Sequence, residues 1–137
     1  MNDYIFIDTN LWLYIFIPDD QAKYIKLKAL LHDWFNNNMV VISFQVINEI
    51  TYNLKKKKFL EAEITDIIKT LNKNCIVSNF SYDILMKASE LREKYMLSFW
   101  DSLIVSTAIS TNCKTLYSED MQSGMNIEGT KILNPLL

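Results

Sequence analysis

Glycine is almost absent from this chain of 137 residues, occurring only at Gly124 and Gly129. The turns that cradle the phosphates of dinucleotides and nucleoside triphosphates need glycines at fixed spacing between a strand and a helix. Neither a G-x-G-x-x-G turn nor a G-x-x-x-x-G-K loop can be written anywhere in the sequence. The shortage of glycine therefore excludes Rossmann-type and P-loop nucleotide binding.

Histidine and cysteine are equally scarce. The one histidine, His32, lies in an apolar-periodic stretch beside Trp34, which favours a structural role and argues against a serine triad. Cys75 and Cys113 are far apart and form no C-x-x-C pair, so a zinc site of Cys and His ligands is excluded. We expect both cysteines to be small buried side chains in a reducing compartment, without a disulfide.

Long hydrophobic runs are missing as well. Residues 11–17 form one of the longest runs, and this is far short of the roughly 18 residues of a membrane-spanning helix. The first ten residues contain Asp3 and Asp8 and lack the basic start and small-residue cleavage site of a secretory signal. The sequence predicts a cytoplasmic protein without a membrane segment.

Half of the residues are hydrophobic, which suits one globular domain over residues 1–137. Short apolar runs alternate with segments of helical periodicity, a pattern typical of an α/β fold in which helices cover both faces of a parallel sheet. We expect Thr9 or Asn10 to cap a helix over residues 11–16, and Ser43, Ser81 and Ser98 to cap three further helices. The expected strands are residues 4–7, 39–42, 75–77, 115–117 and 131–133.

Four acidic residues follow the expected strands: Asp8, Glu49, Asp101 and Asp120. In parallel α/β sheets, ligands bind beyond the carboxyl ends of the strands. Each acid alone has an ordinary explanation, such as a strand-ending turn, a helix cap or a loop position. Together they predict a group of carboxylates at one edge of the sheet that requires a cation.

Oxygen ligands without nearby histidine or cysteine favour Mg²⁺ or Mn²⁺. One or two such ions can activate water and stabilise charge on the leaving oxygen of a phosphodiester. Thr9, Asn10 and Ser118 are polar neighbours that can hold the carboxylates by hydrogen bonds, although caps and turns would use the same residue types. Phosphodiester hydrolysis is the reaction that this set of residues favours.

The sequence around these acids resembles the four acidic motifs of PIN-domain nucleases. The motifs occur in the family's order along the whole chain, as FIDTN from Phe6, SFQVINE from Ser43, LSFWDSLI from Leu97 and LYSEDMQ from Leu116. Each motif alone is a weak indication of the family, because it also occurs by chance. The four motifs in this order are a specific indication. Ser102 departs from the alanine of many relatives.

This resemblance implies a three-layer α/β/α sandwich with a parallel five-stranded sheet, and a Mg²⁺- or Mn²⁺-dependent endoribonuclease of the VapC toxin type. It further implies an RNA substrate, a homodimer and an inhibitory antitoxin protein. Carried over by motif, Asp8, Glu49, Asp101 and Asp120 are the catalytic metal ligands, and Asn10 and Ser118 are polar residues near them. Asp120 matches the most variable position, and the adjacent Glu119 is an alternative to it.

The four acids are also compatible with other functions. The chain can be an RNA-processing or DNA-directed nuclease outside a toxin-antitoxin pair, because the acids define the reaction and not the polymer. A silent PIN-fold binding module is a second alternative, which the intact acids disfavour. An aspartyl phosphoenzyme using Asp8 is weaker, because Asn10 stands where such enzymes generally have a second aspartate.

The net charge is −2, so no overall basic field indicates nucleic acid. Basic residues are nevertheless concentrated in one block, at Lys55, Lys56, Lys57 and Lys58. We expect this block to end the helix that carries Glu49, where lysines complement the helix dipole. A solvated helix end accounts for the block by itself, and contact with a neighbouring RNA phosphate is the functional alternative.

Overall fold

The computed structural model describes residues 2–137. The strands are β1 (Asp3–Ile7), β2 (Asn38–Ser43), β3 (Ile76–Ser78), β4 (Cys113–Tyr117), β5 (Asn126–Ile127) and β6 (Thr130–Leu133). The helices are α1 (Thr9–Phe16), α2 (Gln21–Asn37), α3 (Phe44–Lys56), α4 (Glu61–Asn74), α5 (Tyr82–Tyr95) and α6 (Phe99–Ser110). All five strands expected from the sequence are present, as β1, β2, β3, β4 and β6.

The strands form one sheet in the order β3-β2-β1-β4-β6-β5. Pairing is parallel from β3 to β6, and only β5 runs antiparallel to its neighbour. β5 is an addition to the expected five strands, and it forms a hairpin with β6 through Glu128 and Gly129. Both turn residues have positive φ, 49° and 92°, as a two-residue hairpin turn requires.

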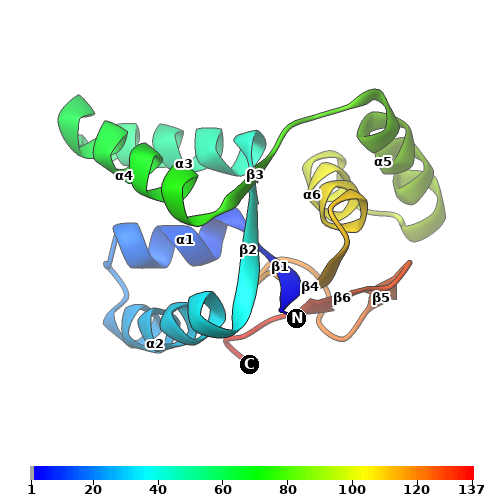
Figure 1. The fold of residues 1–137 in the computed structure, drawn as a ribbon, viewed down its shortest axis with the longest axis horizontal. Helices are drawn as coiled ribbons and strands as arrows, with labels where there is room; N and C mark the ends of the chain where they lie inside the picture. The colour runs from blue at the N-terminus through cyan, green and yellow to red at the C-terminus, as the bar shows by residue number, and fades with distance from the viewer. Residues whose placement is uncertain (1) are drawn as a thin grey trace.

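Helices cover both faces of the sheet, which confirms the α/β sandwich. Helices α1 to α4 lie on one side, and α6 lies on the other with α5 packed against it (Figure 1). The central strands β1 and β4 contribute fully buried residues such as Phe6 and Leu116. Strands that are covered on both faces are continuous apolar runs in the sequence, and they could be predicted for this reason.

Hydrogen-bonding side chains set the starts of the helices. The hydroxyls of Ser43, Ser81 and Ser98 each accept a hydrogen bond of 3.2 Å from the backbone amide three residues later in the chain. These hydrogen bonds confirm the three expected caps. The cap expected at Thr9 or Asn10 is wrong by one or two positions, because Asp8 caps α1 and its side chain accepts from the Thr9 amide. The residue that ends β1 therefore also starts α1.

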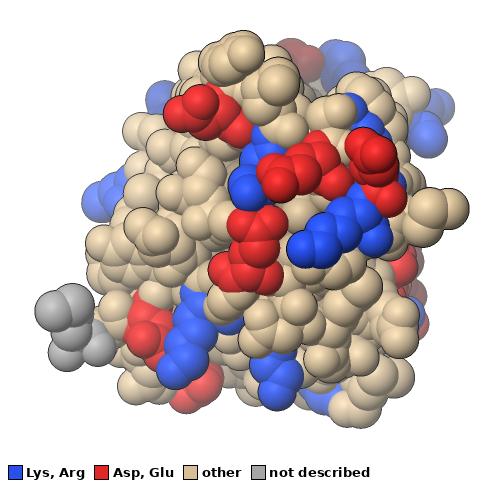
Figure 2. Space-filling model, turned by 90° about the vertical axis from the view of Figure 1, so that its right-hand side faces the viewer, with Lys and Arg blue, Asp and Glu red and all other residues tan. Residues whose placement is uncertain are grey.

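Charges of both signs are interspersed on the side of the molecule that α5, α6 and the β5–β6 hairpin form (Figure 2). Lys87 of α5, for example, pairs with Glu90 at 3.2 Å and with Glu128 at 2.9 Å.

His32 is exposed, Cys113 is buried and Cys75 is half-buried, and both cysteines are free. No helix within residues 2–137 has both the length and the apolar character needed to cross a membrane.

Candidate active site

Asp8 lies at the carboxyl end of the central strand β1, and its residue is only 8% exposed. Its Oδ1 accepts from the Thr9 amide at 2.8 Å, and its Oδ2 accepts from the Ser118 hydroxyl at 2.9 Å. Burial raises the pKa of Asp8 to about 6, against the effect of these two hydrogen bonds. The negative charges of Asp101 and Asp120 contribute further to the raised pKa.

Ser118 connects Asp8 to the segment after β4. This fully buried residue donates its hydroxyl to Asp8, and the same oxygen accepts from the Asp120 amide at 3.3 Å. The backbone amide of Ser118 donates to the Leu133 carbonyl at 2.9 Å, which fixes the end of β4 against β6. The predicted polar neighbour therefore holds two of the four acidic residues.

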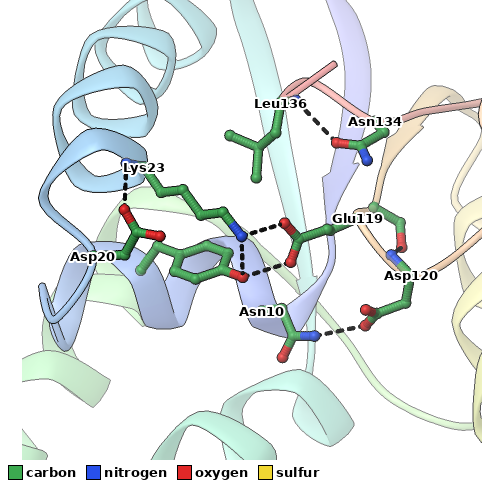
Figure 3. A network of polar contacts seen from close by, with 9 residues as sticks. Asn10, Asp20, Lys23, Glu119, Asp120, Asn134 and Leu136 are labelled. Atoms are coloured by element: carbon green, nitrogen blue, oxygen red, sulfur yellow. Dashed lines mark hydrogen bonds and ion pairs between the residues drawn. The ribbon is translucent and has the colours of Figure 1, made fainter.

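Glu119 and Asp120 point to different parts of the molecule (Figure 3). The Asp120 carboxylate accepts from Asn10 Nδ2 at 2.6 Å, on the side of Asp8. Glu119 instead accepts from the Tyr14 hydroxyl at 2.5 Å and pairs with Lys23 at 2.9 Å. Of the two adjacent acids, Asp120 is the one that lies with the other site residues.

The pKa values of the two neighbours shift in opposite directions. Burial raises the pKa of Asp120, the charges of Glu119 and Asp101 raise it further, and the Asn10 hydrogen bond lowers it. Burial also raises the pKa of Glu119, but the contacts with Tyr14 and Lys23 outweigh burial and leave that pKa below its ordinary value. The negative charge of Glu119 is thus paired with Lys23, whereas Asp120 lies near other negative charges.

Glu49 reaches the site from α3 and is half-buried. Its Oε1 accepts from the Thr9 hydroxyl at 3.2 Å and from Gln45 Nε2 at 3.3 Å. Since the Thr9 amide binds Asp8, residue 9 links two of the four acids. Gln45 was not expected at the site, although its spacing of four residues from Glu49 on a helix places the two side chains together.

Asp101 lies in the first turn of α6, where its amide donates to the Ser98 hydroxyl at 3.2 Å. Its carboxylate acts on the site through its charge, which raises the pKa of both Asp8 and Asp120. Asp8, Asp101 and Asp120 therefore form one group of interacting carboxylates, contributed by three segments of the chain. Glu49 adjoins this group through Thr9.

The donor chemistry of these residues suits a hard divalent cation. No lysine or arginine within residues 2–137 forms an ion pair with any of the four acids. Over the same range, no three His, Cys, Asp or Glu side chains are close enough together to hold a metal ion. Like charges keep carboxylates apart, and a bound cation would remove this repulsion. The residues present are oxygen ligands without a cationic partner, and this chemistry is compatible with a hard divalent cation.

The lysine block lies at the far end of α3 from Ser43. Lys55 pairs with Glu61 at 2.8 Å and Lys57 with Asp19 at 3.0 Å, so two of the four charges have internal partners. Lys56 lies over the Tyr52 ring, with its nitrogen 5.5 Å from the ring centroid. Lys58 follows the helix with a positive φ of 64°.

Comparisons with solved structures give matching folds. A toxin-antitoxin complex from Klebsiella pneumoniae has a TM-score of 0.72 at 21% identity, covering 96% of this chain and 97% of that chain. VapBC2 from Rickettsia felis, bound to a promoter DNA fragment, has a TM-score of 0.68 at 22% identity, covering 94% and 96%. The Sarcin-Ricin loop cleaving toxin VapC20 from Mycobacterium tuberculosis has a TM-score of 0.68 at 22% identity, covering 85% and 89%.

The sequence matches a family model but no individual curated sequence. No curated protein sequence matches the chain significantly. The family model of the PIN domain matches residues 5–123, a range that contains all four acids and their hydrogen-bonding neighbours. With the parallel sheet and the carboxylates at its edge, this match establishes that the chain belongs to the PIN-domain family.

Proposed function

We propose that this protein is a divalent-metal-dependent endoribonuclease that hydrolyses phosphodiester bonds in RNA. The observation that carries the proposal is the buried carboxylate of Asp8, whose raised pKa is increased by Asp101 and Asp120 and offset by no cationic side chain within residues 2–137. Two hydrogen bonds hold the Asp8 carboxylate, but they do not balance the effect of burial and of the neighbouring negative charges, so an ionised Asp8 is costly without a cation. An arrangement of unpaired acids serves better to bind a metal ion.

Asp8, Glu49, Asp101 and Asp120 would hold Mg²⁺ or Mn²⁺ in this function. When bound, the metal supplies a Lewis acid that activates water and stabilises charge on the leaving oxygen. The protein's own hydrogen bonds orient the carboxylates: Ser118 holds Asp8, Thr9 holds Glu49 and Asn10 holds Asp120. These three polar residues therefore position the proposed catalytic acids.

The protonation state of Asp8 in the metal-free protein affects metal binding at such a site. Its pKa of about 6 means that Asp8 carries a proton in a large part of the molecules below that pH. A protonated carboxyl is a poor ligand, because metal binding competes with the proton. At metal concentrations below saturation, we expect metal binding, and with it activity, to increase as the pH rises through about 6.

A cleavage assay tests the proposed reaction. The purified chain is incubated with end-labelled single-stranded RNA, and separately with DNA of the same sequence, in Mg²⁺, Mn²⁺ or EDTA. We expect internal cleavage of RNA that requires a metal and is lost in Asp8→Asn. Asp66→Asn, an exposed change on α4, serves as the matched control. Undiminished cleavage in EDTA would contradict the metal mechanism.

The same assay distinguishes the alternatives that the sequence left open. Cleavage of DNA with RNA intact would identify a DNA-directed enzyme. Absence of cleavage on both polymers, with metal binding retained, would identify a silent PIN-fold module. The unpaired acids favour catalysis over the silent module, since binding alone has no need for them.

We further propose that the protein is the toxin of a toxin-antitoxin pair, with an antitoxin protein as partner, and that it forms a homodimer. The likeness to toxin-antitoxin complexes, which extends over nearly the whole chain, supports the partner. Induced expression should arrest bacterial growth for the wild type and not for Asp8→Asn. Co-expression of the adjacent upstream reading frame should restore growth, and sedimentation of the purified chain tests the dimer.

A further inference from the structure

Gln45 is a buried polar residue in the first turn of α3, where it is only 8% exposed. Glutamine is usually exposed in proteins, and the nearby residues Phe44 and Asn48 of the same helix are exposed here. The Gln45 side chain faces Glu49, one helical turn further along α3. Both side chains line a groove of about 870 Å³ between α3, the loop from β3 to α5, and the start of α6.

The Glu49 carboxylate fixes which way the Gln45 amide points. Nε2 of Gln45 donates to Oε1 of Glu49 at 3.3 Å. The reverse orientation would place the amide oxygen against a carboxylate oxygen, and two acceptors cannot share a hydrogen bond. The amide therefore presents its nitrogen to Glu49 and directs its oxygen elsewhere.

Oε1 of Gln45 has no partner within the protein. It is the one buried side-chain oxygen or nitrogen in residues 2–137 without a hydrogen bond. An unpaired buried polar atom destabilises the folded state, and native proteins contain few of them. The predicted polar neighbours Thr9, Asn10 and Ser118, in contrast, all have hydrogen-bond partners among the acids. The contrast indicates that Gln45 Oε1 accepts from a donor that is not part of the chain.

A hydrated divalent cation would bring such a donor to this place. Mg²⁺ gives up its waters reluctantly, and in proteins it usually keeps several of them beside one or two carboxylates. These waters donate hydrogen bonds outward to acceptors around the site. Glu49 is one of the proposed metal ligands, and it is also the carboxylate that Gln45 contacts. The amide oxygen thus lies beside a ligand of the ion whose waters it can accept from.

We propose that Gln45 is a positioning residue of the metal site, whose nitrogen holds Glu49 and whose oxygen accepts a hydrogen bond from the hydration shell of the bound cation. The inference rests on the proposed metal-dependent function and adds to it a residue that is not itself a ligand. Contacts of this kind change the metal affinity of a site considerably. Without metal the same oxygen is unpaired, so Gln45 lowers the stability of the metal-free protein and raises its affinity for metal.

Gln45→Met tests both halves of this statement, because it removes the two polar atoms and keeps an unbranched, flexible side chain. In EDTA we expect the melting temperature to rise by a few degrees, since the unpaired buried oxygen is gone. We expect the dissociation constant for Mg²⁺ or Mn²⁺, measured by isothermal titration calorimetry, to increase by about tenfold. Gln21→Met, the same substitution at an exposed residue of α2, is the matched control and should leave the metal affinity unchanged.

NMR of the glutamine side chains gives a second measurement that involves no turnover. The chain has three glutamines, Gln21, Gln45 and Gln122, so selective ¹³C labelling gives three side-chain carbonyl signals. The spectrum of Gln45→Met identifies the Gln45 signal by its absence. Addition of Mg²⁺ should move this signal downfield, as for a carbonyl that gains a hydrogen bond, and should leave the Gln21 signal in place.

The outcomes separate this proposal from the proposed reaction. An unchanged metal dissociation constant in Gln45→Met, with a wild type that binds metal and cleaves RNA, would overturn the role of Gln45 and leave the reaction intact. A lower melting temperature of Gln45→Met in EDTA would also overturn it, because a residue needed only for the fold gives that result. So would a Gln45 signal that Mg²⁺ does not move, as expected if Oε1 accepts from ordinary solvent water. A wild type that binds no metal would contradict the proposed reaction itself, and with it this role of Gln45.

Discussion

The hydroxyl of Ser118 donates to Oδ2 of Asp8 at 2.9 Å, although the two residues are 110 positions apart in the chain. Ser118 follows β4 and Asp8 follows β1, and these parallel strands are neighbours in the sheet. The hydrogen bond stabilises the ionised form of Asp8 and so lowers its pKa, against the larger effect of burial. One hydroxyl therefore adjusts the charge of the central acid.

Ser118→Ala should shift the pH dependence of cleavage to higher pH. Without this hydrogen bond the pKa of Asp8 rises above about 6, so less of the carboxylate is ionised at a given pH. At pH 6 we expect about tenfold lower kcat/KM, with partial recovery at pH 8. Pseudo-first-order cleavage rates from pH 5 to pH 8 measure the shift. Ser110→Ala, at the exposed end of α6, is the control, and an identical shift there would contradict the assignment.

Asp8→Asn should stabilise the metal-free protein near neutral pH. Because the folded pKa of Asp8, about 6, lies above the ordinary value of 3.8, its contribution to stability is present at low pH and is lost as the pH rises through about 6. This difference corresponds to about 3 kcal/mol as an upper limit. Asparagine avoids the charge and still caps α1.

Urea unfolding in EDTA at pH 4.5 and pH 7.5 measures this effect. The gain in unfolding free energy from Asp8→Asn should be larger at pH 7.5, while Asp66→Asn should show the same small effect at both values. A loss of stability at pH 7.5 would identify Asp8 as a structural cap whose charge the fold requires.

Mg²⁺ or Mn²⁺ should raise the melting temperature of the wild type. A ligand present at 100 times its dissociation constant stabilises the folded state by about 2.7 kcal/mol, which corresponds to several degrees in a protein of this size. Asp8→Asn and Asp101→Asn should respond much less. Differential scanning fluorimetry with metal titration tests this without any substrate, and equal responses in all three proteins would place the metal elsewhere.

Glu119 and Asp120 should behave differently on substitution despite being adjacent. Asp120→Asn should reduce cleavage by at least about tenfold, since it weakens the acidic group next to Asn10. Glu119→Gln should lower the melting temperature slightly through the contacts with Tyr14 and Lys23, and it should leave most of the activity. The reverse pattern would exchange their roles.

The lysine block divides into two pairs that the structure distinguishes. Lys55 and Lys57 have acidic partners, so we expect phosphate contact from Lys56 and Lys58. Changing Lys56 and Lys58 to glutamine should weaken RNA binding and reduce its salt dependence by about 0.7 per lost phosphate contact. The matched Lys55 and Lys57 double variant should show a smaller change, and turnover at saturating RNA should persist in both. An unchanged salt slope would reject the contact.

The main strands and the four acids could be predicted because each depends on local sequence. Buried parallel strands are continuous apolar runs, and acids at their ends follow from the chain order. β5 was missed because it is two residues long and depends on the positive φ values of Glu128 and Gly129. The choice between Glu119 and Asp120 also needed the structure, since it depends on contacts with Tyr14, Lys23 and Asn10.

The groove beside Glu49, which Trp100, Tyr52 and Phe80 line, could not be predicted from the sequence. Trp100 and Tyr52 lie on different helices, and Phe80 lies in a loop between a strand and a helix. In the sequence each looks like a core residue, because aromatic side chains are usually buried. Their common exposure around one groove follows only from the three-dimensional arrangement.

The placement of β1 beside β4 has a consequence for the synthesis of this protein. β1 is central in the sheet, and its neighbour β4 is completed only at residue 117, more than a hundred residues later in the chain. A growing chain on the ribosome thus carries Asp8 long before Ser118, Asp120 and the second half of the sheet exist. Translation products that stop before Asp120 cannot assemble the four acids, so the acidic site forms only after β4 and the residues that follow it have been made.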